Sequence, residues 1–401
     1  MTETSRQDKH PRSPRPLVIV LAFIAFISLG LPDTILGVAW PSIRSTFALL
    51  LDQIGLLLTA SMAGYLVSSS LGGQLVRTFG VGKLLVVSSL LVTLFLAGDS
   101  LAPAFFWMIP FAVIGGLGSG AIDAAINTFA ALKFSPRIVN WLHAFWGVGA
   151  TIGPLLITAA LATHLGWRVG YAVLAAALAL LSLFFLLTIR LWEIDSTSSS
   201  TSPQPTAAIL EALGRPAVAI QVLLFLVYAG IESTAGQLLY TLLTDSRHIP
   251  LTIAGITVGA YWAALTLGRI FFGQLAVTIS HRTVLRIGLG LAPFAAALIA
   301  WPPAPWVSSV GAVLLGFALA PIFPTLISDT PQRVGRYYAP QSVGFQVAAA
   351  SLGFAAFPSL VGILARRLGL EVICAYLLTA SLTLLALHEF ALRLCPPPTH
   401  R

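Results

Sequence analysis

The sequence predicts an all-α membrane protein in which twelve transmembrane helices form two parallel, pseudo-symmetric six-helix bundles. Three observations lead to this fold class: a very apolar composition, twelve apolar segments long enough to cross a bilayer, and an internal repeat with a period of 200 residues. The three observations point to the same architecture.

The composition excludes a soluble globular protein. Of the 401 residues, 57% are hydrophobic and 9% are charged, whereas soluble domains carry about 25% charged residues. The two cysteines, Cys374 and Cys395, lie in or just after the last apolar segment, which argues against a disulfide framework or a metal site. The first apolar run is long and lacks a small-residue cleavage site, so we expect a span and not a cleavable signal.

The apolar segments are long enough for transmembrane helices, which need about 20 predominantly apolar residues each. Their glycine and proline content is ordinary for membrane helices. In chain order we place them at roughly 17–39, 51–75, 83–101, 104–131, 139–163, 167–190, 217–243, 251–276, 283–301, 306–328, 338–365 and 371–394.

A shift of 200 residues superimposes the second six segments on the first six without a gap. The string Gly73-Gln74-Leu75 meets Gly273-Gln274-Leu275. Glycines coincide at four further places: Gly30 with Gly230, Gly55 with Gly255, Gly116 with Gly316, and Gly153 with Gly353. A repeat in the same order and orientation implies two like bundles related by an axis along the membrane normal, with a binding site between them.

The predicted domains follow from these spans. They are a cytoplasmic tail (1–16), an N-terminal six-helix bundle (17–190), a cytoplasmic linker (191–216), a C-terminal six-helix bundle (217–394) and a second cytoplasmic tail (395–401). The linker contains the one low-complexity segment, rich in serine, threonine and proline. A flexible linker would let the two halves rock against each other.

The net charge of +8 is explained by topology. With the N-terminus inside, 16 of the 22 lysines and arginines fall in predicted cytoplasmic segments, five fall outside, and Arg269 lies within a span. This bias is the positive-inside rule, and it predicts a multi-pass protein of the plasma or inner membrane with both termini cytoplasmic. We therefore expect the protein to interact with the lipid bilayer and not with nucleic acid, despite its positive net charge.

Three acidic residues fall well inside the predicted spans: Asp33, Asp123 and Glu232. A charge near the bilayer centre costs about 2.5–3.5 kcal/mol on insertion scales. A medium of low dielectric constant favours the neutral form of a carboxyl group, so reversible protonation becomes possible. We expect at least one of the three to bind the coupling ion, H⁺ or alternatively Na⁺. The competing explanation is structural, either a hydrogen bond or a buried partner, for which Arg269 is the one cation within the predicted spans.

Uncharged polar and aromatic side chains share the spans of these acids. Asn127 lies one turn after Asp123 on the same helix face. Polar groups can bind hydroxyls while rings cover apolar sugar faces, so the set predicts a site for a polyhydroxylated ligand; each ring alone is also explained by packing. The predicted substrate-binding residues are Asn127, Asn140, His143, Trp146, Tyr228, Gln237, Tyr261, Trp262 and Gln346.

Enzyme motifs are missing from the sequence. The glycines of the run 115–120 resemble a nucleotide-binding loop, but they lie within a predicted span with no preceding strand, so close helix packing is the better interpretation. The sequence contains no phosphate-binding loop, no His-Glu-x-x-His and no credible Ser/His/Asp arrangement. We expect no enzymatic activity and no cofactor.

The twelve spans, parallel halves and central linker resemble the major facilitator superfamily over essentially the whole chain. Three strings are similar to its fucose/glucose permease branch: 31–36 around Asp33, 116–127 with the following 140–147, and 228–232 ending in Glu232. The resemblance implies that Asp33 and Asp123 take part in proton coupling and sugar binding. Glu232 matches an acid found in glucose-type relatives.

The same resemblance implies gating roles for two arginines. Arg77 stands where the superfamily's signature after span two carries an acid, and Arg269 falls in the Gly268-Arg269-x-x-x-Gly273 signature of span eight. The string 149–154 matches part of the antiporter signature of span five.

Three hypotheses remain open from the sequence. The first is a monomeric secondary transporter that couples protons to symport of a sugar or similar small polar solute by alternating access. The alternative is a proton-coupled efflux antiporter for amphipathic compounds or lipids, favoured by the aromatic content and the partial antiporter signature. The third, a non-transporting sensor or scaffold, predicts a partner-binding tail, for which the sequence offers only a short basic N-terminus and the linker.

Overall fold

The computed structural model describes residues 16–193, 211–212, 214–301, 304–335 and 337–394. Within this part of the chain, twelve helices are long and apolar enough to cross a membrane, which confirms the predicted number. The predicted tails, apart from Pro16, lie outside the described residues, as do residues 194–210 of the predicted linker and Cys395.

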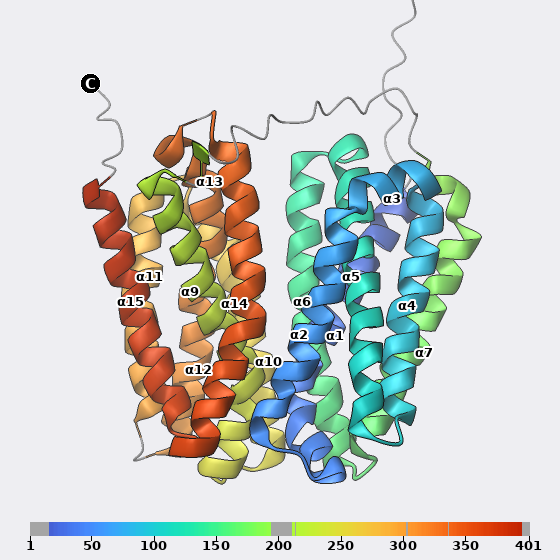
Figure 1. Ribbon diagram of the computed structural model, residues 1–401, viewed down its shortest axis with the longest axis horizontal. Helices are drawn as coiled ribbons and strands as arrows, with labels where there is room; N and C mark the ends of the chain where they lie inside the picture. The colour runs from blue at the N-terminus through green and yellow to red at the C-terminus, as the bar shows by residue number, and fades with distance from the viewer. Residues whose placement is uncertain (1–15, 194–210, 213, 302–303, 336, 395–401) are drawn as a thin grey trace, which may run out of the picture.

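The first half forms one helical bundle, coloured blue to green in Figure 1. Its elements are α1 (Pro16–Phe47), η1 (Leu51–Gln53), α2 (Ile54–Ser70), α3 (Gly72–Phe79), α4 (Val81–Leu101), α5 (Phe105–Lys133), α6 (Pro136–Ala162), α7 (Gly166–Leu187) and η2 (Ile189–Trp192). We call the end of the molecule where α1 begins the terminal end, and the opposite end the far end.

The second half forms a matching bundle beside the first, coloured yellow-green to red. Its elements are α9 (Pro216–Thr241), η3 (Leu242–Ser246), α10 (Leu251–Leu275), α11 (His281–Ala300), α12 (Pro305–Leu319), α13 (Ile322–Val334), α14 (Ala339–Leu368) and α15 (Val372–Leu394). Helix α15 ends at the terminal end, as an even number of spans requires (Figure 1).

Three helices differ from the predicted spans. Helix α1 continues to Phe47, past the predicted end at 39, because polar residues end an apolar run without ending a helix. The second span stops at Ser70, and the chain continues as the separate helix α3. The tenth span is divided into α12 and α13 just before Ile322, where Pro321 has no N–H to continue the helical hydrogen bonds.

The 200-residue repeat is a repeat of helix packing. Gly116 of α5 lies against the backbone carbonyl of Ser61 in α2, and Gly316 of α12 lies against the backbone carbonyl of Tyr261 in α10. The shift of 200 residues relates Gly116 to Gly316, and it also relates their contacts, Ser61 and Tyr261. A side chain at either glycine would collide with the facing backbone, so the repeated glycines permit the same close helix contact in both bundles.

The two bundles contact each other along α1 and α9, α2 and α14, and α6 and α10. At the far end, Arg44 of α1 forms an ion pair with Asp245 of η3 at 2.6 Å. Arg366 of α14 forms a second ion pair with Asp52 of η1 at 3.5 Å. Both ion pairs found between the bundles in the described residues therefore lie at the far end.

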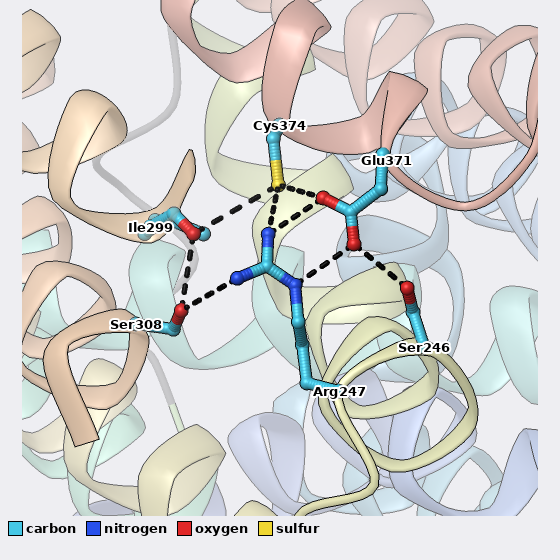
Figure 2. Close-up of polar contacts among 6 residues, drawn as sticks. All are labelled: Ser246, Arg247, Ile299, Ser308, Glu371 and Cys374. Atoms are coloured by element: carbon cyan, nitrogen blue, oxygen red, sulfur yellow. Dashed lines mark hydrogen bonds and ion pairs between the residues drawn. The ribbon is translucent and has the colours of Figure 1, made fainter. Parts of the chain in front are cut away.

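The far end of the second bundle is held by the guanidinium of Arg247 (Figure 2). Its Nε and Nη2 donate to the two carboxylate oxygens of Glu371 at 2.8 and 2.6 Å. Its Nη1 donates to Ser308, whose hydroxyl in turn donates to the carbonyl of Ile299. One arginine thus links the end of α9 and η3 with α11, α12 and the start of α15.

Candidate functional site

A cavity of about 340 Å³ lies between the two bundles and is lined by side chains of both. Leucine, methionine, phenylalanine, alanine and valine side chains form much of its wall. The lining contains two carboxyl groups and no lysine, arginine or histidine. Its polar and aromatic hydrogen-bonding members are Asp33, Ser61, Tyr65, Asp99, Ser119, Trp146, Tyr171, Ser233, Gln237, Trp262 and Ser351.

Asp33 projects from α1 into this cavity at the boundary between the bundles. Pro32, Asp33 and Leu36 share the helix face that lines the cavity, and the Asp33 side chain is exposed to it. The indole Nε1 of Trp146 donates a hydrogen bond to Asp33 Oδ2 at 3.2 Å. Gln237 Nε2, from the other bundle, donates to the backbone carbonyl of Asp33 at 3.1 Å. Asp33 is therefore held from both sides of the boundary.

Asp123 lies behind the cavity wall on α5 and has two hydrogen-bond donors. Tyr65 donates to its Oδ2 at 2.9 Å and Asn127 Nδ2 donates to its Oδ1 at 2.8 Å. The bond from Asn127 follows the predicted one-turn spacing. Tyr65 itself lines the cavity, and Asp33 and Asp123 interact electrostatically. The two predicted acids of the first bundle thus belong to one polar group.

Glu232 lies in the core of the second bundle, with 1% of its surface exposed. Tyr228 donates a hydrogen bond to its carboxylate, and Nη2 of Arg269 lies 3.7 Å from its Oε2. Tyr261 donates to the backbone carbonyl of Glu232 at 3.0 Å. The pairing with Arg269, which the sequence left as the competing explanation for the acids, is present for this acid.

Two tryptophans cross the boundary between the bundles. The rings of Trp146 on α6 and Trp262 on α10 pack edge to face, with centroids 5.9 Å apart, and both line the cavity. The guanidinium carbon of Arg269 lies 5.6 Å from the centre of the Trp146 ring. Arg269 therefore contacts an acid of its own bundle and an aromatic ring of the other.

Of the predicted substrate-binding residues, Trp146, Gln237 and Trp262 line the cavity. Asn127, Tyr228 and Tyr261 instead bond to the acids, as described above. Gln346 is buried and exchanges hydrogen bonds with Thr330.

Three further predicted residues lie elsewhere or cannot be placed. His143 is exposed on α6, edge-on to the ring of Phe26, and interacts electrostatically with Asp123 and Arg269. Arg77 is exposed on α3 at the terminal end, away from the cavity wall. The side chain of Asn140 lies outside the described part of the structure.

One acid of the cavity wall was missed by the sequence analysis. Asp99, near the end of α4, lines the cavity with only 2% of its surface exposed. It was missed because it lies two residues from the end of the predicted span at 83–101. The repeat contained a signal that could have found it, since a shift of 200 residues places Asp99 on the apolar Ile299.

Four buried polar atoms in the cavity wall have no hydrogen-bond partner among the described residues. They are Asp99 Oδ1, Ser233 Oγ, Gln237 Oε1 and Trp262 Nε1. Buried polar atoms are nearly always hydrogen-bonded, so these four are available to a water molecule or a ligand in the cavity. Acceptors and a donor occur together, which suits a ligand carrying both kinds of group.

Comparisons with known proteins agree with the fold. The family model described as Major Facilitator Superfamily matches residues 21–358 and 222–401. The glucose/mannose transporter GlcP of Bacillus subtilis is 21% identical over 326 residues, covering 79% of this chain and 80% of that protein.

Two solved structures have the same fold. The nucleoside transporter NupG superimposes with a TM-score of 0.78 at 14% identity, covering 92% of this chain and 98% of that one. The E. coli fucose:proton symporter FucP superimposes with a TM-score of 0.64 at 14% identity, covering 94% of this chain and 98% of that one.

Proposed function

Because the chain belongs to the Major Facilitator Superfamily and is a transporter, not an enzyme, we propose that it couples protons to the movement of a sugar or similar small polar solute. The relatives support this substrate class, since one is a glucose/mannose transporter and another a fucose:proton symporter. The solute would bind in the cavity between the bundles, where the unpartnered polar atoms and the two tryptophans lie.

The observation that carries the proposal is the position of Asp33. Its carboxylate accepts from Trp146, and its backbone carbonyl accepts from Gln237 of the opposite bundle. Protonation turns the carboxylate into a donor that a solute hydroxyl can accept from. Rocking of the bundles changes the distance to Gln237. One residue would therefore respond to proton, solute and conformation, which is what coupled transport requires.

Alternating access is the proposed mechanism. The positive-inside bias supports a cytoplasmic terminal end, so the far end would face outward. The ion pairs Arg44–Asp245 and Arg366–Asp52 join the bundles at the far end, which supports a conformation closed to the outside. Transport would require these pairs to break while the bundles approach each other at the terminal end.

Uptake into proteoliposomes tests the proposal. An inward proton gradient should drive accumulation of at least one member of a panel of hexoses, pentoses, amino sugars and nucleosides. Asp33→Asn should abolish this accumulation while retaining counterflow, the exchange of labelled for unlabelled solute without net proton movement. Asp123→Asn should weaken both. Glu193→Gln, an exposed carboxyl at the end of η2, is the matched control. If the gradient drives no accumulation, or Asp33→Asn transports like wild type, the proposal is wrong.

The apolar part of the cavity wall favours a second candidate, a proton-coupled efflux antiporter for amphipathic compounds. Leu36, Leu57, Met62, Phe95 and Phe354 all line the cavity and could bind the apolar part of such a compound. A resistance screen in an efflux-deficient host separates the two candidates, because only an exporter protects its host.

A further inference from the structure

We infer that Asp99 is a specificity-determining residue that recognises an amino group on the transported solute. This assignment rests on the proposed function, because it takes the cavity between the bundles to be the solute site. It narrows the solute class from small polar molecules in general to those that carry a primary or secondary amine.

The first argument is that Asp99 is buried without a partner. Only 2% of its surface is exposed, and its Oδ1 has no hydrogen-bond partner among the described residues. A buried carboxyl group is costly unless it is paired or hydrogen-bonded. By contrast, Asp33 and Asp123 both accept hydrogen bonds from neighbouring side chains. Of these three acids, Asp99 is therefore the one whose Oδ1 lacks a hydrogen-bond donor among the described residues.

The second argument is that the nearby arginine does not supply the donor. Arg168 of α7 donates through Nη1 to the carbonyl of Ser100 and through Nη2 to the carbonyl of Ala102, both at 2.8 Å. Its guanidinium is therefore engaged with the end of α4. Arg168 does not line the cavity, and among the described residues the lining contains no lysine, arginine or histidine that could reach the carboxyl. A cation for Asp99 would have to come from the solute.

The third argument is the aromatic surroundings of Asp99. Phe95 lies one turn earlier on α4 and Tyr171 faces it from α7, and both line the same cavity. Tyr171 also interacts electrostatically with Asp99. A carboxylate flanked by aromatic rings suits an ammonium group, which gains a charge-assisted hydrogen bond from the carboxylate and attraction to the ring faces. A neutral hydroxyl group would form a weaker hydrogen bond with the carboxylate and would be attracted less strongly to the rings.

The fourth argument comes from the repeat. The residue equivalent to Asp99 in the second bundle is Ile299, which is fully buried near the end of α11. The packing of this helix end is therefore compatible with an apolar side chain. An acid at the equivalent place in the first bundle is not required by the scaffold, which favours a role in binding.

Thermal-shift titrations of the purified full-length protein test the inference with matched pairs of probes: glucose and glucosamine, cyclohexanol and cyclohexylamine, benzyl alcohol and benzylamine. For wild type, at least one amino member should stabilise the protein at concentrations about 10-fold lower than its hydroxyl partner, as expected for a hydrogen bond to a charged group. Asp99→Asn should remove this preference, so that the amino member and the hydroxyl member of a pair stabilise the variant at similar concentrations.

Two results of the ligand titrations would overturn the inference. One is that no amino member binds wild type more tightly than its hydroxyl partner, and the other is that the preference survives Asp99→Asn. A ligand-free measurement covers the case in which Asp99→Asn does not fold. Asp99→Ile, which copies Ile299, should melt at or above the wild-type temperature, and a lower melting temperature would show that the carboxyl is structural and refute the inference.

These measurements use no proton gradient, so they are independent of the coupling test. Failure of gradient-driven uptake would disprove the proposed coupling and leave the assignment of Asp99 standing. Absence of an amine preference in the wild-type protein would do the reverse.

Discussion

Arg44 and Asp245 form an ion pair of 2.6 Å that joins the far ends of the two bundles. A shift of 200 residues moves position 44 to position 244, which is next to Asp245. The corresponding helix ends of the two bundles therefore contribute one charge each to the pair. The duplicated scaffold thus brings two equivalent helix ends together, and opposite charges at those ends attach them.

We predict that this ion pair biases the protein toward the conformation closed at the far end. Arg44→Ala should shift the equilibrium toward far-end opening by a factor of about 2 to 5, the effect expected for a partly exposed ion pair of about 0.5–1 kcal/mol. The readout is labelling of a cysteine introduced at Ser359, which packs against Gly55 between the bundles, by a membrane-impermeant maleimide.

The charge-swapped protein Arg44→Asp with Asp245→Arg is the control. It should restore slow labelling, because the pair is re-formed with reversed polarity. Equal labelling of wild type, single variant and swapped protein would show that the pair has no influence on opening.

The buried pair of Glu232 and Arg269 should matter much more for stability. Arg269→Leu leaves Glu232 in the protein core without its cation, which should cost about 3–5 kcal/mol of unfolding free energy. Adding Glu232→Gln should recover most of the loss, since it removes the uncompensated charge. Unfolding in detergent gives both values. Arg286→Leu, which breaks the exposed pair with Glu389, should leave the unfolding free energy nearly unchanged, because water screens an exposed ion pair.

The contact of Arg247 with Glu371 predicts a pH dependence of stability. The hydrogen bonds from Arg247 hold the pKa of the Glu371 carboxyl below its usual value. The carboxylate therefore stabilises the folded protein above the ordinary glutamate pKa of about 4.3, and this stabilisation is lost as the pH falls through the lower pKa of the folded state.

Replacing Glu371 by glutamine should reveal this contribution. Glu371→Gln should be less stable than wild type at pH 7 by at most about 1 kcal/mol, because the carboxylate is half exposed. The difference should stay the same between pH 7 and 5, which lie above the ordinary glutamate pKa, and shrink when melting temperatures are compared at pH 5, 4 and 3. Figure 2 shows the contacts of the Glu371 carboxylate. A difference that stays constant down to pH 3 would indicate a packing effect and not an ionic one.

The repeated glycines should be necessary for helix packing in both bundles. Gly116→Ala and Gly316→Ala each place a methyl group against a facing backbone carbonyl, and each should cost about 1–3 kcal/mol of unfolding free energy. Gly290→Ala on α11 is the matched control, because a methyl group there meets no other atom within 4 Å. Alanine at this helical position should be neutral or stabilising. Similar melting temperatures for all three variants would contradict the packing role.

The sequence by itself determined the twelve spans and the two parallel bundles. These follow from apolar length and from the repeat, both of which are local or periodic properties of the chain. It also identified Asp33 and Asp123 as acids within spans, and the bond between Asp123 and Asn127 follows from helical spacing alone.

Only the tertiary structure decided which side chains share the cavity. It placed Trp146, Gln237 and Trp262 in the wall and left Gln346 bonded to Thr330 outside it. It also paired Glu232 with Arg269 and buried Asp99 without a partner. The reason is physical. A residue's place along a span follows from the sequence, but whether it faces lipid, a neighbouring helix or a cavity depends on how helices distant in the chain rotate and pack against one another.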